Sequence, residues 1–92
     1  MAVYVDDMRA PFGRMIMCHL IADSRAELDT MVDKIGVARK WIQHADTDRE
    51  HYDISLSMRA KAIKVGAIEI TGHELGLRLY AKRQNSKTPS FG

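Results

Sequence analysis

Two apolar segments near the start of the chain predict β-strands. Residues 2–5 are rich in β-branched and aromatic side chains, and residues 15–22 are apolar at nearly every position. A strand of the second kind is typical of the centre of a sheet, where both of its faces are covered. Pro11 and Gly13 interrupt regular structure between the two segments, so residues 9–14 are expected to form a loop.

The segment after the second strand predicts a helix. Ser24 and Glu27 have the spacing of a capping box, and Gly36 supplies a C-terminal stop. Apolar residues recur between them at helical spacing, namely Leu28, Met31, Val32 and Ile35. We therefore expect one helix between Ser24 and Gly36.

Two further helices are predicted from their caps. One is expected to begin at Ser55 or Ser57 and to end before Gly66. The other begins at the capping box of Thr71 and Glu74. Short strands are expected around these helices, at residues 37–42, 52–54 and 67–70.

Strands alternate with helices through most of this pattern, and the connections from helix to strand are short. Such units generally make right-handed crossovers onto a largely parallel sheet. We therefore expect an α/β fold, a compact single-domain sandwich with a mostly parallel sheet of about four to five short strands and three helices. Ligands bind outside the carboxyl ends of parallel strands, where Asp6, Asp7, Asp23 and Asp53 are expected to fall.

The composition fits one domain. The chain has 92 residues, of which 46% are hydrophobic, and this length leaves no room for a second core. We assign residues 1–82 to a single α/β domain. Residues 83–92 hold basic and small polar side chains without an acidic one, and are expected to form a flexible basic C-terminal tail. The net charge of +2 is spread along the chain and does not by itself indicate nucleic acid binding.

The cysteine count and the first residues indicate a compartment. Cys18 is the single cysteine, which excludes an internal disulfide and a zinc site built from several cysteines. Acids at positions 6 and 7 do not fit a signal peptide, which has a basic start and a longer apolar stretch. The apolar run at residues 15–22 is too short to span a bilayer. We therefore expect a soluble, cytoplasmic protein with no membrane partner.

Asp6 and Asp7 follow the first predicted strand, where a carboxylate can bind a metal or act as a general acid or base. Successive side chains of a strand alternate between its faces, so one of the two acids is expected to face a cleft. Both can instead be turn formers, because aspartate bonds nearby backbone amides. His19, in the second predicted strand, is either a metal ligand or base, or a core histidine bonded to a backbone carbonyl or to Asp6.

His51 and Asp53 are two residues apart, so on a strand both side chains project to one face. Together with Asp6, Asp7 and His19 they predict a divalent-metal site, in which Asp6, His19 and Asp53 are the candidate catalytic residues. Mixed nitrogen and oxygen ligands favour Mn²⁺, Fe²⁺ or Zn²⁺ over Mg²⁺, which prefers oxygen alone. The alternative is a surface histidine followed by an aspartate that caps the approach to the helix.

Four residues are candidate phosphate contacts. Ser57 and Arg59 lie at the start of the second predicted helix, where backbone amides and the helix dipole favour an anion, and Arg9 and Arg14 lie in the first loop. An ordinary serine cap and a solvated basic face explain the same residues. The sequence has no glycine-rich dinucleotide or P-loop motif, and so no nucleotide cofactor motif.

Trp41 follows two basic residues, and such an aromatic ring can serve as a stacking platform for a nucleic acid base. A half-buried strand residue near a protein interface explains the same pattern. The six methionines and an edge strand near Trp41 are compatible with a homodimer.

Several segments together resemble a family of small bacterial and phage proteins that is catalogued only as a domain of unknown function. The segments are Val3–Pro11, Met17–His19, Ile35–Trp41, His51–Ser57, Arg59–Ala60 and Gly66–Ala67. The resemblance covers about residues 2–71 and implies a phage or prophage context, without an established activity. The family often has a histidine where this chain has Asp29.

A looser similarity is to the PIN-like metal-dependent nucleases. These have a strand that ends in paired acids, a later aspartate before Ser-x-Arg-Ala, and a strand after Gly-Ala. The similarity implies that Asp6, Asp7 and Asp53 hold metal ions that activate water against a phosphodiester. This chain is much shorter than those nucleases, and histidines are not part of their pattern.

Two hypotheses of function follow from these features. The first is a metal-dependent phosphodiesterase or nuclease that hydrolyses a nucleic acid or nucleotide. The second is a non-enzymatic binding module, such as a phage-encoded modulator that docks on a host protein, in which Asp6, His19 and Asp53 form a structural hydrogen-bond network. Metal binding discriminates between the two hypotheses.

Overall fold

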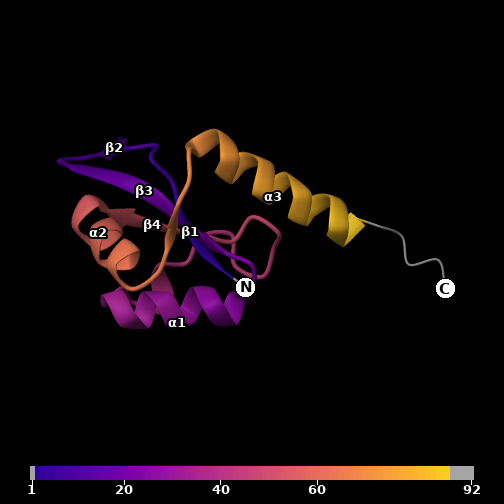
Figure 1. Cartoon of the computed structure of the whole chain (residues 1–92), viewed down its shortest axis with the longest axis horizontal. Coiled ribbons are helices and arrows are strands. Elements are labelled where there is room, and N and C mark those ends of the chain that lie inside the picture. The colour runs from indigo at the N-terminus through magenta and orange to yellow at the C-terminus, as the bar shows by residue number, and fades with distance from the viewer. Residues whose placement is uncertain (1, 88–92) are drawn as a thin grey trace.

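The computed structural model describes residues 2–87, apart from the side chains of Phe12 and of residues 85–87 (Figure 1). The strands are β1 (Val3–Val5), β2 (Ala10–Phe12), β3 (Met15–Ala22), β4 (Tyr52–Ser55) and β5 (Ile68–Glu69). The helices are α1 (Arg25–Ile35), α2 (Leu56–Lys64) and α3 (Gly72–Lys87), with a short 3-10 helix at Arg39–Trp41. The predicted α/β class, with three helices and a sheet of four to five strands, is confirmed for these residues.

The sheet is mixed and mostly antiparallel, so the prediction of a mostly parallel sheet is wrong. β3 pairs antiparallel with β1, β2 and β4, and the pairing of β1 with β5 is parallel. The physical reason is the short connections from β1 to β2 and from β2 to β3. A parallel pair needs a crossover of a dozen or more residues, and these connections hold no helix.

β3 is the central strand, as its apolar sequence predicted. Met17 pairs with Ala10 of β2 and with Ser55 of β4, while Leu20 pairs with both Val5 and Tyr52. Each of these β3 residues therefore has β4 on one side and either β1 or β2 on the other. β1 and β2 thus pair with successive parts of the same edge of β3. β4 occupies the other edge.

The loop predicted at residues 9–14 is in part a strand. Ala10–Phe12 pairs with Met15–Met17, and the chain reverses at Gly13 and Arg14, where Gly13 has a φ of 61°. Pro11 is tolerated because β2 is the last strand on its side of the sheet, where no further strand of residues 2–87 needs its missing N–H.

The strand predicted at residues 37–42 is also wrong. Residues 39–41 form a 3-10 helix, because Arg39 turns back toward α1 and donates to Asp33, with 2.7 Å between Nη2 and Oδ2. The Tyr52 hydroxyl donates to the Arg39 carbonyl oxygen at 3.3 Å. These contacts fix a turn where alternation alone favoured a strand.

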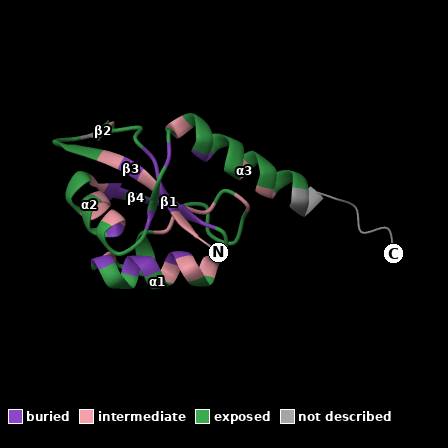
Figure 2. Cartoon of the chain, in the orientation of Figure 1, coloured by how far each residue is buried: buried purple, intermediate pink, exposed green. Residues whose placement is uncertain are grey.

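Helices cover both faces of the sheet (Figure 1). On one face α1 and α2 pack against side chains that include Val5, Leu20 and Ile54. On the other face α3 contributes Leu75 to a smaller cluster with Tyr4 and Ile21. Burial is concentrated along β1, β3 and the inner side of α1 (Figure 2).

The predicted helix caps are confirmed. Ser24 and Ser55 accept hydrogen bonds from the backbone amides of Glu27 and Met58, at 3.2 and 3.3 Å. Gly36 ends α1 with a φ of 85°, and the Thr71 hydroxyl caps α3. α3 continues to Lys87, into the segment predicted as a tail, and residues 88–92 lie outside the described residues.

Candidate metal centre

Three of the candidate ligands converge through the antiparallel pairing of β3 with β4. His19 is directly opposite Asp53, so their side chains project to the same face of the sheet. His51 projects to that face as well, because it lies two residues before Asp53 and continues the strand through a bridge to Gln43. Tyr52, between them, projects into the core and is fully buried.

Asp6 occupies a bulge behind His19. The pairing of β1 with β3 breaks after Val5, and residues 6–9 bulge opposite the shorter segment 18–19 before pairing resumes at Ala10. The Asp6 side chain is fully buried there, and its Oδ2 accepts from His19 Nδ1 at 2.7 Å. Its Oδ1 accepts from the backbone N–H of His19 at 2.7 Å. Both carboxylate oxygens are therefore committed to His19.

The electrostatics of this pair favour an ion pair. Burial by itself raises the pKa of the Asp6 carboxyl, but hydrogen bonds from the His19 side chain and backbone outweigh it and leave that pKa below its ordinary value. The hydrogen bond to Asp6 raises the pKa of His19, against a smaller opposing effect of burial. Asp6 is therefore a carboxylate, which can only accept, and His19 Nδ1 carries a proton.

The second imidazole is held in the same way by a different acceptor. His51 Nδ1 lies 2.8 Å from the Arg49 carbonyl oxygen, which cannot donate, so this nitrogen also carries a proton. The opposite nitrogen, Nε2, lies 3.4 Å from Asp53 Oδ1, and His19 Nε2 lies 3.7 Å from the same oxygen. The two rings meet edge to face, with centroids 5.4 Å apart. In their neutral forms both histidines therefore point a lone pair at Asp53.

One nitrogen from each histidine and one oxygen of Asp53 lie within 4.8 Å of one another. Two imidazole nitrogens and a carboxylate are a donor set that suits Zn²⁺, Mn²⁺ and Fe²⁺. Metal-bound histidines commonly donate their other ring N–H to a carboxylate or a backbone carbonyl, which is what His19 and His51 do here. The residues present therefore fit a divalent metal, with Asp6 supporting a ligand instead of serving as one.

Arg25 of α1 forms ion pairs with acidic residues of the loop that precedes His51. Its Nη1 lies 3.2 Å from Asp46 Oδ1 and 3.3 Å from Glu50 Oε1, and its Nε donates to Asp29 at 3.1 Å. Asp29, where the resembling family often has histidine, thus anchors this loop and also accepts from the Tyr52 hydroxyl.

A pocket of about 510 Å³ opens beside the three ligands. Its lining residues are Ala10, Pro11, Met17, His19, Val37, Trp41, Gln43 and Asp53. Most of these side chains are apolar, and two of the candidate ligands, His19 and Asp53, are among the polar ones. This volume is in the range of sites that hold one small molecule.

The other candidate residues lie elsewhere. Asp7 is exposed and its Oδ1 accepts from the Gly72 backbone N–H at 2.9 Å, at the start of α3. Arg59 donates from Nε to the Asp6 backbone oxygen at 2.8 Å and from Nη2 to Glu69, so it braces the bulge. The three acids of the PIN-like layout, Asp6, Asp7 and Asp53, are not gathered into one cluster.

The remaining predicted phosphate contacts do not line the pocket either. Ser57 is exposed, with its hydroxyl 3.0 Å from that of Ser55. Arg9 and Arg14 are exposed on either side of β2, and Arg9 has a φ of 51°.

His44 is a neighbour of the site that sequence reasoning missed. Its ring centroid lies 5.7 Å from that of His51, because the bridge between Gln43 and His51 closes the intervening loop. An isolated histidine in a polar loop carries no sequence signal of this proximity. Gln43 was likewise assigned only to a loop, although it lines the pocket.

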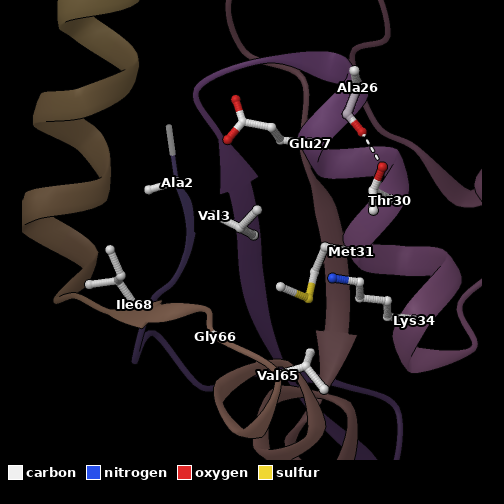
Figure 3. Close-up of a pocket in the computed structure, with 10 residues that line it drawn as sticks. All are labelled: Ala2, Val3, Ala26, Glu27, Thr30, Met31, Lys34, Val65, Gly66 and Ile68. Carbon is white, nitrogen blue, oxygen red and sulfur yellow. Dashed lines mark hydrogen bonds between the residues drawn. The ribbon is translucent and has the colours of Figure 1, made fainter.

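A second hollow, of about 400 Å³, lies between α1 and the turn from α2 to β5 (Figure 3). Aliphatic side chains such as Met31 and Val65 line it, together with Glu27 and Lys34. None of the candidate ligands lines this hollow.

Within residues 2–87, no helix combines the length and the apolar character that a membrane span requires. The searches for similar curated proteins and for similar solved structures found no match. A family profile, described as a protein of unknown function (DUF4031), matches residues 3–82. This match confirms the predicted membership of a domain of unknown function, while the phage context and the PIN-like similarity stay predictions. The chain belongs to the DUF4031 family.

Proposed function

We propose that this protein binds one divalent transition metal at His19, His51 and Asp53 and uses it to hydrolyse a phosphate ester. The observation that supports this most is the direction of the two imidazoles. Each Nδ1–H is fixed by an acceptor that cannot donate, so both Nε2 atoms meet the Asp53 carboxylate. Two imidazole nitrogens and a carboxylate oxygen that face one another form the donor set that a divalent metal ion binds, with the metal taking the place of any proton on Nε2.

A divalent metal held by His19, His51 and Asp53 would supply an activated water at neutral pH and would polarise the ester oxygen. Hydrolysis adds one water across the ester: its oxygen bonds to phosphorus, and the leaving oxygen takes the electron pair of the broken bond and one proton. The second proton passes to solvent. Asp6 acts through His19, by holding its ring and its Nδ1 proton, and is a positioning residue.

The place for the substrate is the pocket, because His19 and Asp53 both line it. A small phosphodiester fits there better than a duplex. No lysine or arginine lines the pocket among residues 2–87, whereas duplex binding relies on several basic contacts to phosphates.

Release of 4-nitrophenolate from thymidine 5′-(4-nitrophenyl) phosphate tests the proposal. The assay is run with Mn²⁺, Zn²⁺ or Mg²⁺ and with a chelator. We expect turnover with Mn²⁺ or Zn²⁺, and background rates with the chelator or with His51→Ala. His73→Ala is the matched control, because His73 is exposed on α3, and it should keep full activity. Turnover that survives the chelator or His51→Ala contradicts the proposal.

The non-enzymatic binding module is the second candidate function. The observation that favours it is the exposure of Leu77 and Tyr80 on α3, at 55% and 62%. A binding module keeps its affinity for a protein partner when metal is removed. If His51→Ala leaves a partner's affinity unchanged and no ester is hydrolysed, this candidate replaces the first.

A further inference from the structure

We infer that the pocket beside the metal centre takes a single nucleotide unit, with its base stacked on Trp41 and its phosphate at His19 and Asp53. This inference rests on the proposed function for the phosphate half alone. The base half stands on the geometry of Trp41 and its neighbours.

The Trp41 side chain is largely exposed and takes no part in the core of the fold. Its exposed fraction is 60%, and it belongs to neither core cluster of the described residues. An indole left open to water forgoes the stabilisation that burial of its large apolar surface brings. A flat aromatic face at the wall of a pocket gains that stabilisation when a planar ring stacks on it.

The backbone that carries Trp41 is held in place before any ligand arrives. Arg39, two residues earlier, makes a bidentate contact with Asp33 of α1 through Nε and Nη2, at 3.1 and 2.7 Å. The Tyr52 hydroxyl donates to the Arg39 carbonyl oxygen, and the backbone N–H of Trp41 donates to the Ala38 carbonyl oxygen at 3.2 Å. Because this backbone is already fixed, only the Trp41 side chain has to be ordered on binding, and more of the stacking energy appears as affinity.

The rest of the pocket suits a nucleobase. Pro11 and Met17 supply apolar surface, and a methionine sulfur packs favourably on aromatic rings. The Gln43 amide lines the same space; its Nε2 donates to the Trp41 carbonyl oxygen at 3.4 Å, and its oxygen and second N–H can bond a base edge. The Lys40 ammonium lies over the Trp41 ring, 5.1 Å from its centroid, and so places a positive charge beside this aromatic wall of the pocket.

The size and charge of the pocket favour one nucleotide over a polymer track. About 510 Å³ is space for one small ligand. A groove for single-stranded nucleic acid adds basic residues along the backbone and further aromatic rings. Trp41 is the single aromatic ring besides His19 in the described lining.

Fluorescence of Trp41 tests this inference directly, because the chain has one tryptophan. Thymidine 5′-monophosphate, thymidine and ribose 5-phosphate are titrated with and without Zn²⁺. We expect the monophosphate with Zn²⁺ to quench the emission at the lowest concentration and thymidine to quench it without metal. Ribose 5-phosphate should not quench. Calorimetry with Trp41→Ala should show an affinity for the monophosphate about tenfold weaker, with the Zn²⁺ affinity unchanged.

Leu56→Ala is the matched control, since Leu56 is an exposed apolar residue on α2 that does not line the pocket, and it should bind the monophosphate as the wild type does. Trp41→Ala with unchanged affinity for the monophosphate overturns the inference and leaves the metal site standing. Quenching by thymidine in a protein that binds no Zn²⁺ overturns the proposed function and leaves the base platform standing. The nucleotide in the pocket could be free or could be the end of a strand, and a 5′-phosphorylated thymidine decanucleotide distinguishes the two. A decanucleotide that binds as tightly as the monophosphate indicates a strand end. One that binds about tenfold more weakly indicates a free nucleotide.

Discussion

Replacement of Asp6 by asparagine tests how the site positions its first histidine. Asparagine keeps the shape of the side chain but offers one acceptor oxygen and one donor NH₂ group. Asp6 makes two 2.7 Å hydrogen bonds as an acceptor, to the backbone N–H and to Nδ1 of His19. In Asp6→Asn one of these donors must face the NH₂ group inside a fully buried bulge.

If the asparagine side chain keeps its oxygen toward the backbone N–H of His19, its NH₂ group faces Nδ1, and the ring proton of His19 moves from Nδ1 to Nε2. Nδ1 then accepts from the asparagine, and Nε2 carries the proton and loses the lone pair that a metal needs. Loss of such a supporting contact weakens metal affinity by about 10- to 100-fold, or roughly 1.4 to 2.8 kcal/mol. We therefore expect the dissociation constant for Zn²⁺, measured by calorimetry, to rise by that factor.

Asp7→Asn is the matched control, because Asp7 is the exposed neighbour and contacts Gly72 instead of a histidine. It should bind Zn²⁺ within about twofold of the wild type. Circular dichroism establishes that both variants are folded at the temperature of the titration. A folded Asp6→Asn protein that binds Zn²⁺ as tightly as the wild type refutes the reasoning.

The remaining predictions concern the support of the site and the stability of the core. Arg25→Ala removes the contacts that hold Asp46 and Glu50, so hydrogen exchange of residues 44–50 should become faster and the Zn²⁺ affinity should fall; unchanged exchange contradicts the fastening role. Burial and the hydrogen bond to Asp29 raise the pKa of Tyr52 to about 12, so ultraviolet titration should show a late tyrosine component that is absent from Tyr52→Phe. Because the raised pKa disfavours ionisation in the folded state, stability present below pH 10 should be lost as the pH rises from 10 to 12, and a flat profile of urea midpoints there contradicts this. Leu28→Ala removes a side chain that is 1% exposed in the main core and should lower the free energy of unfolding by about 2 to 5 kcal/mol; a loss under about 1 kcal/mol would mean that the site is loosely packed.

The helices were predictable because their signals are local. Ser24, Ser55 and Thr71 each accept a hydrogen bond from the backbone amide three residues further along, so the sequence spacing determines the contact. Gly36 ends α1 because its positive φ suits glycine. Such signals do not depend on the rest of the fold.

The sheet was less predictable because strand direction depends on distant pairing. The sequence of residues 10–12 contains no local signal that they pair with residues 15–17. Pro11 also disfavours a strand at any position other than the edge of a sheet. The alternation at residues 37–42 was overridden by Arg39, which binds carboxylates of α1 and makes a turn more favourable. Tertiary contacts decided both segments.

The residue types of the candidate site were visible in the sequence, and their arrangement was not. Asp6, His19, His51 and Asp53 lie near one another in the structure, but through antiparallel register instead of the ends of parallel strands. Adjacent acids suggested a shared site, yet Asp6 turns inward to His19 while Asp7 binds the start of α3. Adjacency in the sequence therefore gave a wrong grouping of these two acids, because cross-strand pairing determines which side chains meet.

Anomalous diffraction from crystals grown with Zn²⁺ tests the central claim most directly. The account predicts one strong peak in contact with Nε2 of His19, Nε2 of His51 and a carboxylate oxygen of Asp53, at about 2.0 to 2.2 Å from each. The same crystals of His51→Ala should lack this peak. Diffraction that shows no zinc at these three side chains, or zinc held by Asp6 and Asp7 instead, would contradict the account.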